Sequence, residues 1–292
     1  MKPKVAVISL GSYDYLVDIV TDGLIRELGR ENVHLHYKIT HMGGDIRYTH
    51  LAKGFFDRPN SFGLYEADAL VISTRSGLAP LQEWVSRTGK KTVGVLDGND
   101  DVHLIPELQA AAKIYFKREH FGDRQYPGNV RPLPFAALPE EPSARAPEIE
   151  RMVFFMGHNG VPARAEIAAR LRHMGWPASG GGSTKEHYNR LLRGSLVAVS
   201  VRGFGWDTYR YWEIPYFGAC LLSERLPITI PKNFVDGEEA VFFTGPDEFQ
   251  EKLAKLLLDP QEGIRIAANG KKAAMERHLS IHRARSVLTE LL

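Results

Sequence analysis

Residues 196–224 read LVAVSVRGFGWDTYRYWEIPYFGACLLSE, and this stretch decides the fold. The apolar runs 196–201 and 219–223 have the length and the continuous hydrophobicity of buried parallel strands. Between them, the sequence predicts a tight glycine loop and then a short helix. That helix is expected to open near Asp207 or Thr208, because both residue types favour the N-cap position. A strand, a loop and a helix followed by another buried strand form the repeating unit of parallel α/β sheets.

The loop and the helix carry the residue types that an anionic ligand needs. Gly203 and Gly205 permit close approach of the backbone, and the exposed amides of a helix start attract an anion. Arg210 and Glu213 are three residues apart, so they share one face of the helix. A phosphate needs amides and a cation, and a sugar diol needs a carboxylate. The segment therefore predicts a seat for a nucleotide diphosphate. The structural alternative is a surface ion pair between Arg210 and Glu213, worth under about 1 kcal/mol.

A second alternative is a dinucleotide site. Residues 203–208, GFGWDT, fit the pattern GxGxxG loosely, with Thr208 in the third glycine position. However, the segment comes late in the chain. In addition, no acidic residue closes a second strand about 20 positions on, because Glu224 is too close. The sequence gives a nicotinamide cofactor little support.

Composition bounds the protein class. The chain has 292 residues, 43% of them hydrophobic, which suits two domains of about 150 residues. A formal charge of +2 does not indicate non-specific nucleic-acid binding. The single cysteine, Cys220, excludes a disulfide framework and indicates a reducing, cytoplasmic setting. No run approaches the roughly 20 apolar residues of a membrane span.

The first half alternates short apolar strands with helices, which predicts a parallel, doubly wound sheet. Strands are expected at 5–10, 33–39, 69–73, 92–96, 112–116 and 131–135, with helices at 14–28 and 79–87. Such sheets bind ligands beyond the carboxyl ends of their strands. The candidate residues at that edge are Gly11, Ser12, Tyr13, Asp14, Arg75, Asp97, Asp100, Lys117 and Arg118.

The second half restarts the same scheme after a linker rich in proline and charge. We expect an N-terminal domain at 1–140, the linker at 141–150 and a C-terminal domain at 151–292. Its first strand, 152–156, leads into a loop that contains His158, and Arg164 lies on the helix that follows. Further strands are expected at 196–201, 219–223 and 240–244, with helices at 247–258, 260–276 and 280–292.

The second half resembles a known family. Residues 202–227, RGFGWDTYRYWEIPYFGACLLSERLP, resemble the nucleotide-sugar segment of the GT-B glycosyltransferases, which have two Rossmann-like domains facing a cleft. The resemblance is closest to the bacterial spore-maturation (spore-coat) glycosyltransferase-like family, with a local exostosin-like motif. Residues 234–278, from FVDGEEAVFF to AAMERH, resemble the ending of the same family. The resemblance covers the chain from about residue 151 onward.

This resemblance implies a metal-independent glycosyltransferase whose donor is a nucleotide sugar, UDP- or GDP-linked, with no other cofactor. Arg210 would stabilise the charge on the leaving diphosphate, and Glu213 would bind the ribose hydroxyls. Asp97 is the first candidate for the general base of an inverting transfer, with a solvated acidic turn as the alternative. The whole donor site would comprise Gly11, His158, Arg164, Gly203, Gly205, Asp207, Thr208, Arg210 and Glu213. The last helix would cross back to the N-terminal domain.

Several alternatives stay open. Retaining relatives carry Glu-x7-Glu here, and Glu213 matches the second glutamate while Gly205 stands at the first, so the stereochemical class is not assigned. A sugar-nucleotide 2-epimerase shares the architecture, and a non-catalytic nucleotide-sugar binding protein is a third reading. The acceptor could be a polysaccharide, a protein, a lipid carrier or a modified nucleic-acid base, and the oligomeric state is open. No metal site is expected, because His278 and His282 lack an intervening carboxylate and fit a solvated helix face.

Overall fold

The chain folds into two compact units. The computed structural model describes residues 1–39, 58–139, 148–157, 160–180 and 184–292. The first unit combines Met1–Phe135 with Ser280–Leu292, and the second spans Ala136–Leu279. The first unit thus ends shortly before the boundary expected at residue 140, and most of the expected linker, 141–150, lies outside the described residues.

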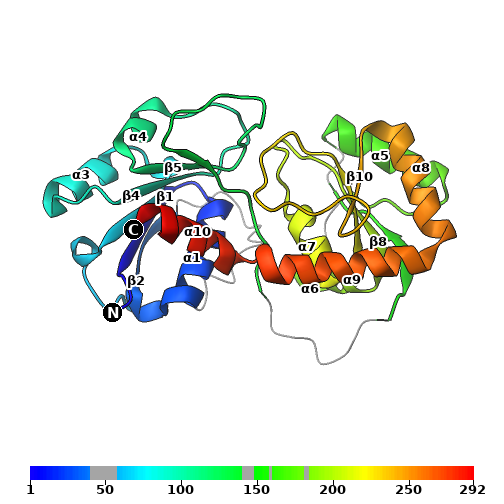
Figure 1. Cartoon of the computed structure of the whole chain (residues 1–292), viewed down its shortest axis with the longest axis horizontal. Coiled ribbons are helices and arrows are strands. Elements are labelled where there is room, and N and C mark those ends of the chain that lie inside the picture. The colour runs from blue at the N-terminus through cyan, green and yellow to red at the C-terminus, as the bar shows by residue number, and fades with distance from the viewer. Residues whose placement is uncertain (40–57, 140–147, 158–159, 181–183) are drawn as a thin grey trace. The chain divides into compact units, whose positions relative to one another are not determined.

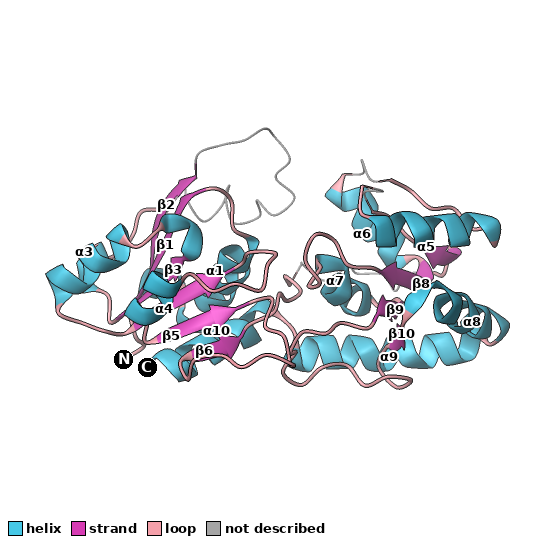
Figure 2. Ribbon diagram, turned by 90° about the horizontal axis from the view of Figure 1, so that it is seen from above, coloured by secondary structure: helices cyan, strands magenta, loops and turns pink. Residues whose placement is uncertain are grey.

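The first unit is built on a six-stranded parallel sheet in the order β2-β1-β3-β4-β5-β6 (Figure 2). Its strands are β1 (Val5–Gly11), β2 (Val33–Ile39), β3 (Ala69–Ser73), β4 (Val93–Asp97), β5 (Ile114–Lys117) and β6 (Val130–Pro132). Its helices are α1 (Tyr15–Leu28), α3 (Ala79–Thr88), α4 (Pro106–Ala111) and α10 (Ser280–Leu291). All six expected strands are confirmed within a few residues, whereas α4 was not anticipated.

Helices cover both faces of this sheet, as a doubly wound fold requires. Leu81 and Trp84 of α3 and Leu108 of α4 join one buried cluster with residues of β1, β3 and β4. On the other face, Leu291 of α10 lies against Gly94, where an added Cβ would be 3.4 Å from the leucine side chain. Apolar side chains of helices therefore pack against both faces of this sheet.

The last helix, α10, packs against α1 within the first unit (Figure 1). Gly23 lies at the contact, where a Cβ would overlap the carbonyl oxygen of Ser280. The hydroxyl of Ser280 donates to the carboxylate of Asp22. Arg283 donates from Nε to the carbonyl oxygen of Pro134 at 3.0 Å. Glycine is thus required where the two helices meet most closely.

The second unit is built on a four-stranded parallel sheet in the order β10-β9-β8-β7. Its strands are β7 (Arg151–Phe154), β8 (Ser195–Ser200), β9 (Cys220–Glu224) and β10 (Val241–Phe243). Its helices are α5 (Pro162–His173), α6 (Lys185–Arg193), α7 (Tyr209–Phe217), α8 (Gly245–Leu258) and α9 (Pro260–Arg277). The two strands predicted in 196–224 and the short helix between them are confirmed.

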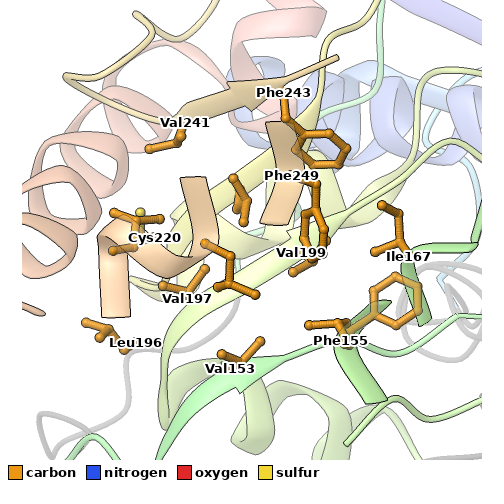
Figure 3. Close-up of a cluster of buried hydrophobic side chains, with 14 of the residues drawn as sticks. Val153, Phe155, Ile167, Leu196, Val197, Val199, Cys220, Val241, Phe243 and Phe249 are labelled. Atoms are coloured by element: carbon orange, nitrogen blue, oxygen red, sulfur yellow. The ribbon is translucent and has the colours of Figure 1, made fainter. Parts of the chain in front are cut away.

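Figure 3 shows the core of this unit, in which Val197, Val199 and Phe243 of the sheet meet Phe249 of α8. Phe154 faces the opposite side and contacts Tyr188 of α6, with ring centroids 5.7 Å apart. Helices therefore cover both faces here too. Cys220 is fully buried in the centre, and this burial raises the pKa of its thiol to about 12. The cysteine is a packing residue, as its place in an apolar strand predicted.

The first unit also buries a row of carboxyl groups on α1. Asp14, Asp18 and Asp22 are four residues apart and share one face. Asp14 caps the helix, accepting from the amide of Leu16 at 3.1 Å. Asp22 accepts from Nε of Arg26 at 2.8 Å. Burial, reinforced by the charge of Asp14, raises the pKa of Asp18 to about 8.

The raised pKa of Asp18 predicts how stability depends on pH. An unfolded aspartate titrates near pH 4, so between about pH 4 and 8 Asp18 holds a proton in the folded chain that it has lost in the unfolded chain. The free energy of unfolding should therefore fall through this window as pH rises. Asp18→Asn removes this titration. As pH rises through the window, the free energy of unfolding of the variant should therefore increase relative to that of the wild type, by up to about 1.4 kcal/mol per pH unit.

Urea unfolding at pH 5, 6.5 and 8 measures this difference. Asp123→Asn, at an exposed position of the same unit, is the matched control and should follow the wild type at every pH. Parallel pH profiles for wild type and Asp18→Asn would contradict the assignment.

Candidate functional site

The candidate site lies in the second unit, where β8 ends at Ser200 and α7 begins at Tyr209. Thr208 is the N-cap residue of α7 and has extended backbone angles, as predicted. Its hydroxyl makes no capping hydrogen bond and instead lies 3.1 Å from the hydroxyl of Ser200. The amides at the start of α7 are thus not capped by Thr208, as an anion site at this helix end requires.

Asp207 lies directly before the N-cap residue of α7. Its side chain is buried, and its Oδ1 accepts a hydrogen bond of 2.7 Å from the indole Nε1 of Trp212. This bond ties the residue before the N-cap to the interior of α7. The carboxylate of Asp207 is therefore turned toward the protein core and fixes the start of the helix. Of the two N-cap candidates, Thr208 takes that position, and the place of Asp207 in the donor site stays a prediction.

The glycine loop before α7 is held by its neighbours on both sides. Arg202 donates from Nη1 to Oε1 of Glu224 at 2.7 Å, and its backbone amide donates to Oε2 at 3.2 Å. The guanidinium of Arg202 also lies 4.3 Å from the ring centre of Trp206. The amide of Gly203 donates to the carbonyl oxygen of Gly205 at 2.9 Å, which closes a tight turn. The loop is thus a braced structure.

Glu224 is a residue that sequence reasoning missed. It was considered only as an acidic residue of a dinucleotide site. The register of the sheet pairs Ser200 of β8 with Ser223 of β9, so the residues just after these positions lie near each other. Arg202 and Glu224 have opposite charges at adjacent strand ends. This pair of opposite charges could have been recognised from the sequence alone.

Two arginines meet beside this loop. An added Cβ at Gly203 would lie 2.8 Å from Nη2 of Arg164, so a larger residue here would require that guanidinium to shift. Arg164 also lies 3.4 Å from the carbonyl oxygen of Val201 through Nε. Burial, together with the nearby charge of Arg210, lowers the pKa of Arg164 to about 10. The structure thus brings Arg164, Gly203 and Arg210 together, as the sequence predicted.

The charges of this arginine pair are not balanced within the protein. Among the described residues, no ion pair joins Arg164 or Arg210 to a carboxylate. The Nε of Arg210 is buried and has no hydrogen-bond partner among the residues that the structure describes. Two guanidinium groups held close together repel each other, and desolvation adds to the cost. An anion bound between them would reduce the repulsion and offset the cost of desolvation. The arrangement therefore has the electrostatics of an anion site.

Glu213 lies one turn further along α7 and is half-buried. No ion pair joins it to Arg210 in the described part of the chain, so the alternative of a surface ion pair between the two is wrong. Helical spacing keeps the carboxylate on the side of Arg210. A cationic and an anionic side chain are therefore presented along one helix face without neutralising each other.

The remaining donor-site candidates are Gly205, His158 and Gly11. Gly205 is buried in the braced loop. His158 lies outside the described residues, although the adjoining Gly157 contacts the stem of Arg164, with an added Cβ 3.3 Å from its Cδ. Gly11 ends β1 with φ of 88° and belongs to the first unit.

Asp97 does not have the environment predicted for a general base. Its side chain and that of Lys117 are both 0% exposed, and Lys117 Nζ lies 2.8 Å from Asp97 Oδ2. The hydroxyl of Tyr115 donates to the same oxygen at 2.7 Å. An acceptor hydroxyl cannot reach a carboxylate enclosed in this way. Asp97 is a buried structural partner, neither a cleft-facing base nor part of a solvated turn. Its register partner on β5 is Lys117, which adjacent strand ends could have indicated.

Metal ligation is not indicated by the described residues, which contain no cluster of three or more potential ligands among His, Cys, Asp and Glu. His278 is fully buried, and its ring lies 5.0 Å from Trp212 and 4.7 Å from Phe234. It follows the end of α9, so the solvated helix face expected for it is wrong. Within the described ranges, no helix has the length and hydropathy needed to cross a membrane.

Comparison with known proteins gives one family match and several similar structures. Residues 151–289 match the model of a family described as glycosyl transferase-like. No curated protein sequence matches the chain. Among solved structures, HepE from Anabaena in complex with UDP-glucose has a TM-score of 0.66 at 9% identity, over 98% of both chains. Sucrose-phosphate synthase from Thermosynechococcus elongatus has a TM-score of 0.66 at 11% identity, over 99% of this chain and 98% of that one.

A third similar structure is a putative UDP-N-acetylglucosamine 2-epimerase from Listeria monocytogenes, with a TM-score of 0.53 at 14% identity. It covers 95% of this chain and 94% of the epimerase. At such identities the likeness establishes the fold alone. The chain has the two-domain, parallel α/β fold of the GT-B glycosyltransferases, and its residues 151–289 are similar to the glycosyl transferase-like family.

Proposed function

We propose that this protein is a glycosyltransferase that moves a sugar from a nucleotide-sugar donor to an acceptor hydroxyl, without a metal ion. The observation that carries the proposal is the unbalanced pair of Arg164 and Arg210 at the start of α7, inside the glycosyl transferase-like domain. The resemblance of residues 202–227 to the spore-maturation glycosyltransferase-like family adds support within this class.

The chemistry of transfer explains why such a pair would be useful. When the anomeric C–O bond breaks, negative charge builds on the departing diphosphate. Preorganised cations and amide dipoles stabilise that charge without reorganisation at the moment of reaction. Arg164 and Arg210 supply two cations, and the amides at the start of α7 supply aligned dipoles. Gly203 supplies the space in which Arg164 can approach.

Glu213 completes the donor site in this proposal. Its carboxylate would accept hydrogen bonds from the two ribose hydroxyls, each worth about 1.5–3 kcal/mol because one partner is charged. One helical turn separates it from Arg210, which suits a ligand that carries its ribose next to its diphosphate. The donor would be UDP- or GDP-linked, and the UDP-glucose complex of HepE, which has the same fold, favours UDP.

A 2-epimerase acting on a nucleotide sugar is the second candidate, because the Listeria epimerase shares the fold. Its structural similarity is lower, with a TM-score of 0.53 against 0.66 for HepE and sucrose-phosphate synthase. The two activities differ in one requirement. A transferase consumes its donor at full rate only when an acceptor is present, whereas an epimerase needs none.

Nucleotide binding is the first prediction. A ligand at 100 times its dissociation constant should stabilise the chain by about 2.7 kcal/mol. We expect such stabilisation from UDP or GDP and their sugars, unchanged by EDTA because the arginine pair takes the place of a metal. Thermal unfolding with and without each compound measures it. Stabilisation by NAD alone, or by UDP only when a divalent cation is present, would contradict the proposal.

Arg210→Ala is the second prediction. Loss of this guanidinium should abolish stabilisation by nucleotide and lower the rate of transfer by about 10²–10³, the usual cost of one such donor. The matched control is Arg170→Ala, because Arg170 lies on α5 in the same unit and forms an exposed ion pair with Asp247. Unchanged nucleotide binding by Arg210→Ala, measured by calorimetry, would exclude the arginine pair as the diphosphate site.

Asp97→Asn distinguishes a structural aspartate from a catalytic one. The substitution removes the closest carboxylate from the buried Lys117, whose other carboxylate neighbour, Asp101, lies 3.8 Å away, so it should cost up to about 3–5 kcal/mol of stability. The double variant Asp97→Leu/Lys117→Met should recover much of that loss, since neither charge is then buried. Urea unfolding measures both. A stable Asp97→Asn protein that binds nucleotide but has lost only turnover would restore Asp97 as the general base.

A further inference from the structure

Phe204 is the most exposed aromatic side chain of the donor-site loop, with 88% of its surface accessible. A single exposed apolar residue is ordinary on a protein surface and needs no explanation in itself. The position of Phe204 is what requires one. It lies between Gly203 and Gly205, at the carboxyl end of the sheet where parallel α/β folds bind ligands.

The turn that carries Phe204 is fixed at both ends. The hydrogen bond from Gly203 to Gly205 closes directly around it. Before the turn, Arg202 is held by both carboxylate oxygens of Glu224, and after it Trp206 packs on the same guanidinium. An aromatic side chain on a rigid support loses little conformational freedom when it meets a ligand. The loop therefore presents an apolar surface that is already positioned.

Phe204 also directly follows Gly203, the residue that lies beside the guanidinium of Arg164. A Cβ added at Gly203 would lie 2.8 Å from Nη2 of Arg164, and successive Cα atoms are about 3.8 Å apart. A diphosphate held between Arg164 and Arg210 would bring its substituents to the neighbourhood of this loop. A nucleotide sugar has two substituents on its diphosphate, the nucleoside and the transferred sugar.

The two substituents differ in what they require. The ribose is assigned to Glu213, which lies further along α7, away from the loop. The side toward residues 203–205 is then left for the sugar. Phe204 cannot donate to or accept from sugar hydroxyls, but its ring can cover an apolar C–H face of a hexose. We propose that Phe204 packs against the transferred sugar of the donor and so favours the intact nucleotide sugar over the free nucleotide. This inference rests on the proposed function.

Calorimetric titration of the full chain with UDP and UDP-glucose, and with GDP and GDP-mannose, tests the inference. Phe204→Ala should bind the free nucleotide within about twofold of the wild type, since Arg164, Arg210 and Glu213 are untouched. Binding of the nucleotide sugar should weaken by about three- to tenfold, the usual effect of an aromatic contact. Phe204→Tyr should keep the wild-type preference, because it retains the ring.

Each other outcome is informative. Equal weakening of nucleotide and nucleotide sugar would show that Phe204 only supports the loop, and no change for either would show that it does not contact the sugar. Both results would overturn the inference while leaving the proposed function intact. Failure of the wild type to bind any of the four compounds would instead overturn the proposed function, and this inference with it. Thermal unfolding without ligand should be the same for Phe204→Ala and wild type, because the side chain is exposed.

Discussion

The proposed site depends on the positive charge of Arg164 and Arg210, which no carboxylate of the described residues balances. Arg164 lies beside the loop at residues 201–203, burial makes its charge more costly, and the nearby charge of Arg210 adds to this cost. A protein usually balances such charges with a carboxylate, as Arg202 and Glu224 do a few residues away. The described residues provide no such partner for Arg164 or Arg210. The repulsion is therefore retained in the folded chain, where binding of an anion can relieve it.

The fold explains how this arrangement is maintained. β8 is buried along its whole length and fixes where the loop begins, while Asp207 fixes the start of α7 through Trp212. Gly203 leaves the guanidinium of Arg164 undisturbed, since an added Cβ would lie 2.8 Å from its Nη2. The apolar core of β8, β9 and α8 thus holds a polar site rigidly at its edge. Such preorganisation is what electrostatic stabilisation of a leaving group needs, because little has to move during the reaction.

Much of the fold could be predicted from the sequence, because strands that are buried on both faces are continuous apolar runs. Helix α4 was not anticipated, since its six residues are too few for a clear periodic pattern. Arg164 and Arg210 were placed in one donor site by the family resemblance, and the structure brings their charges close together. The burial of Asp97 was not predicted, because an acidic turn looks solvated unless its partner on the next strand is known. The inward turn of Asp207 likewise depends on Trp212, five residues later, which spacing alone does not reveal.

The most direct measurement is a crystal structure of the protein with UDP-glucose bound. The account predicts that diphosphate oxygens lie within hydrogen-bond distance of both Arg164 and Arg210, at the start of α7. It also predicts that both guanidinium groups stay free of protein carboxylates. A diphosphate bound elsewhere, with the two arginines unchanged, would contradict it.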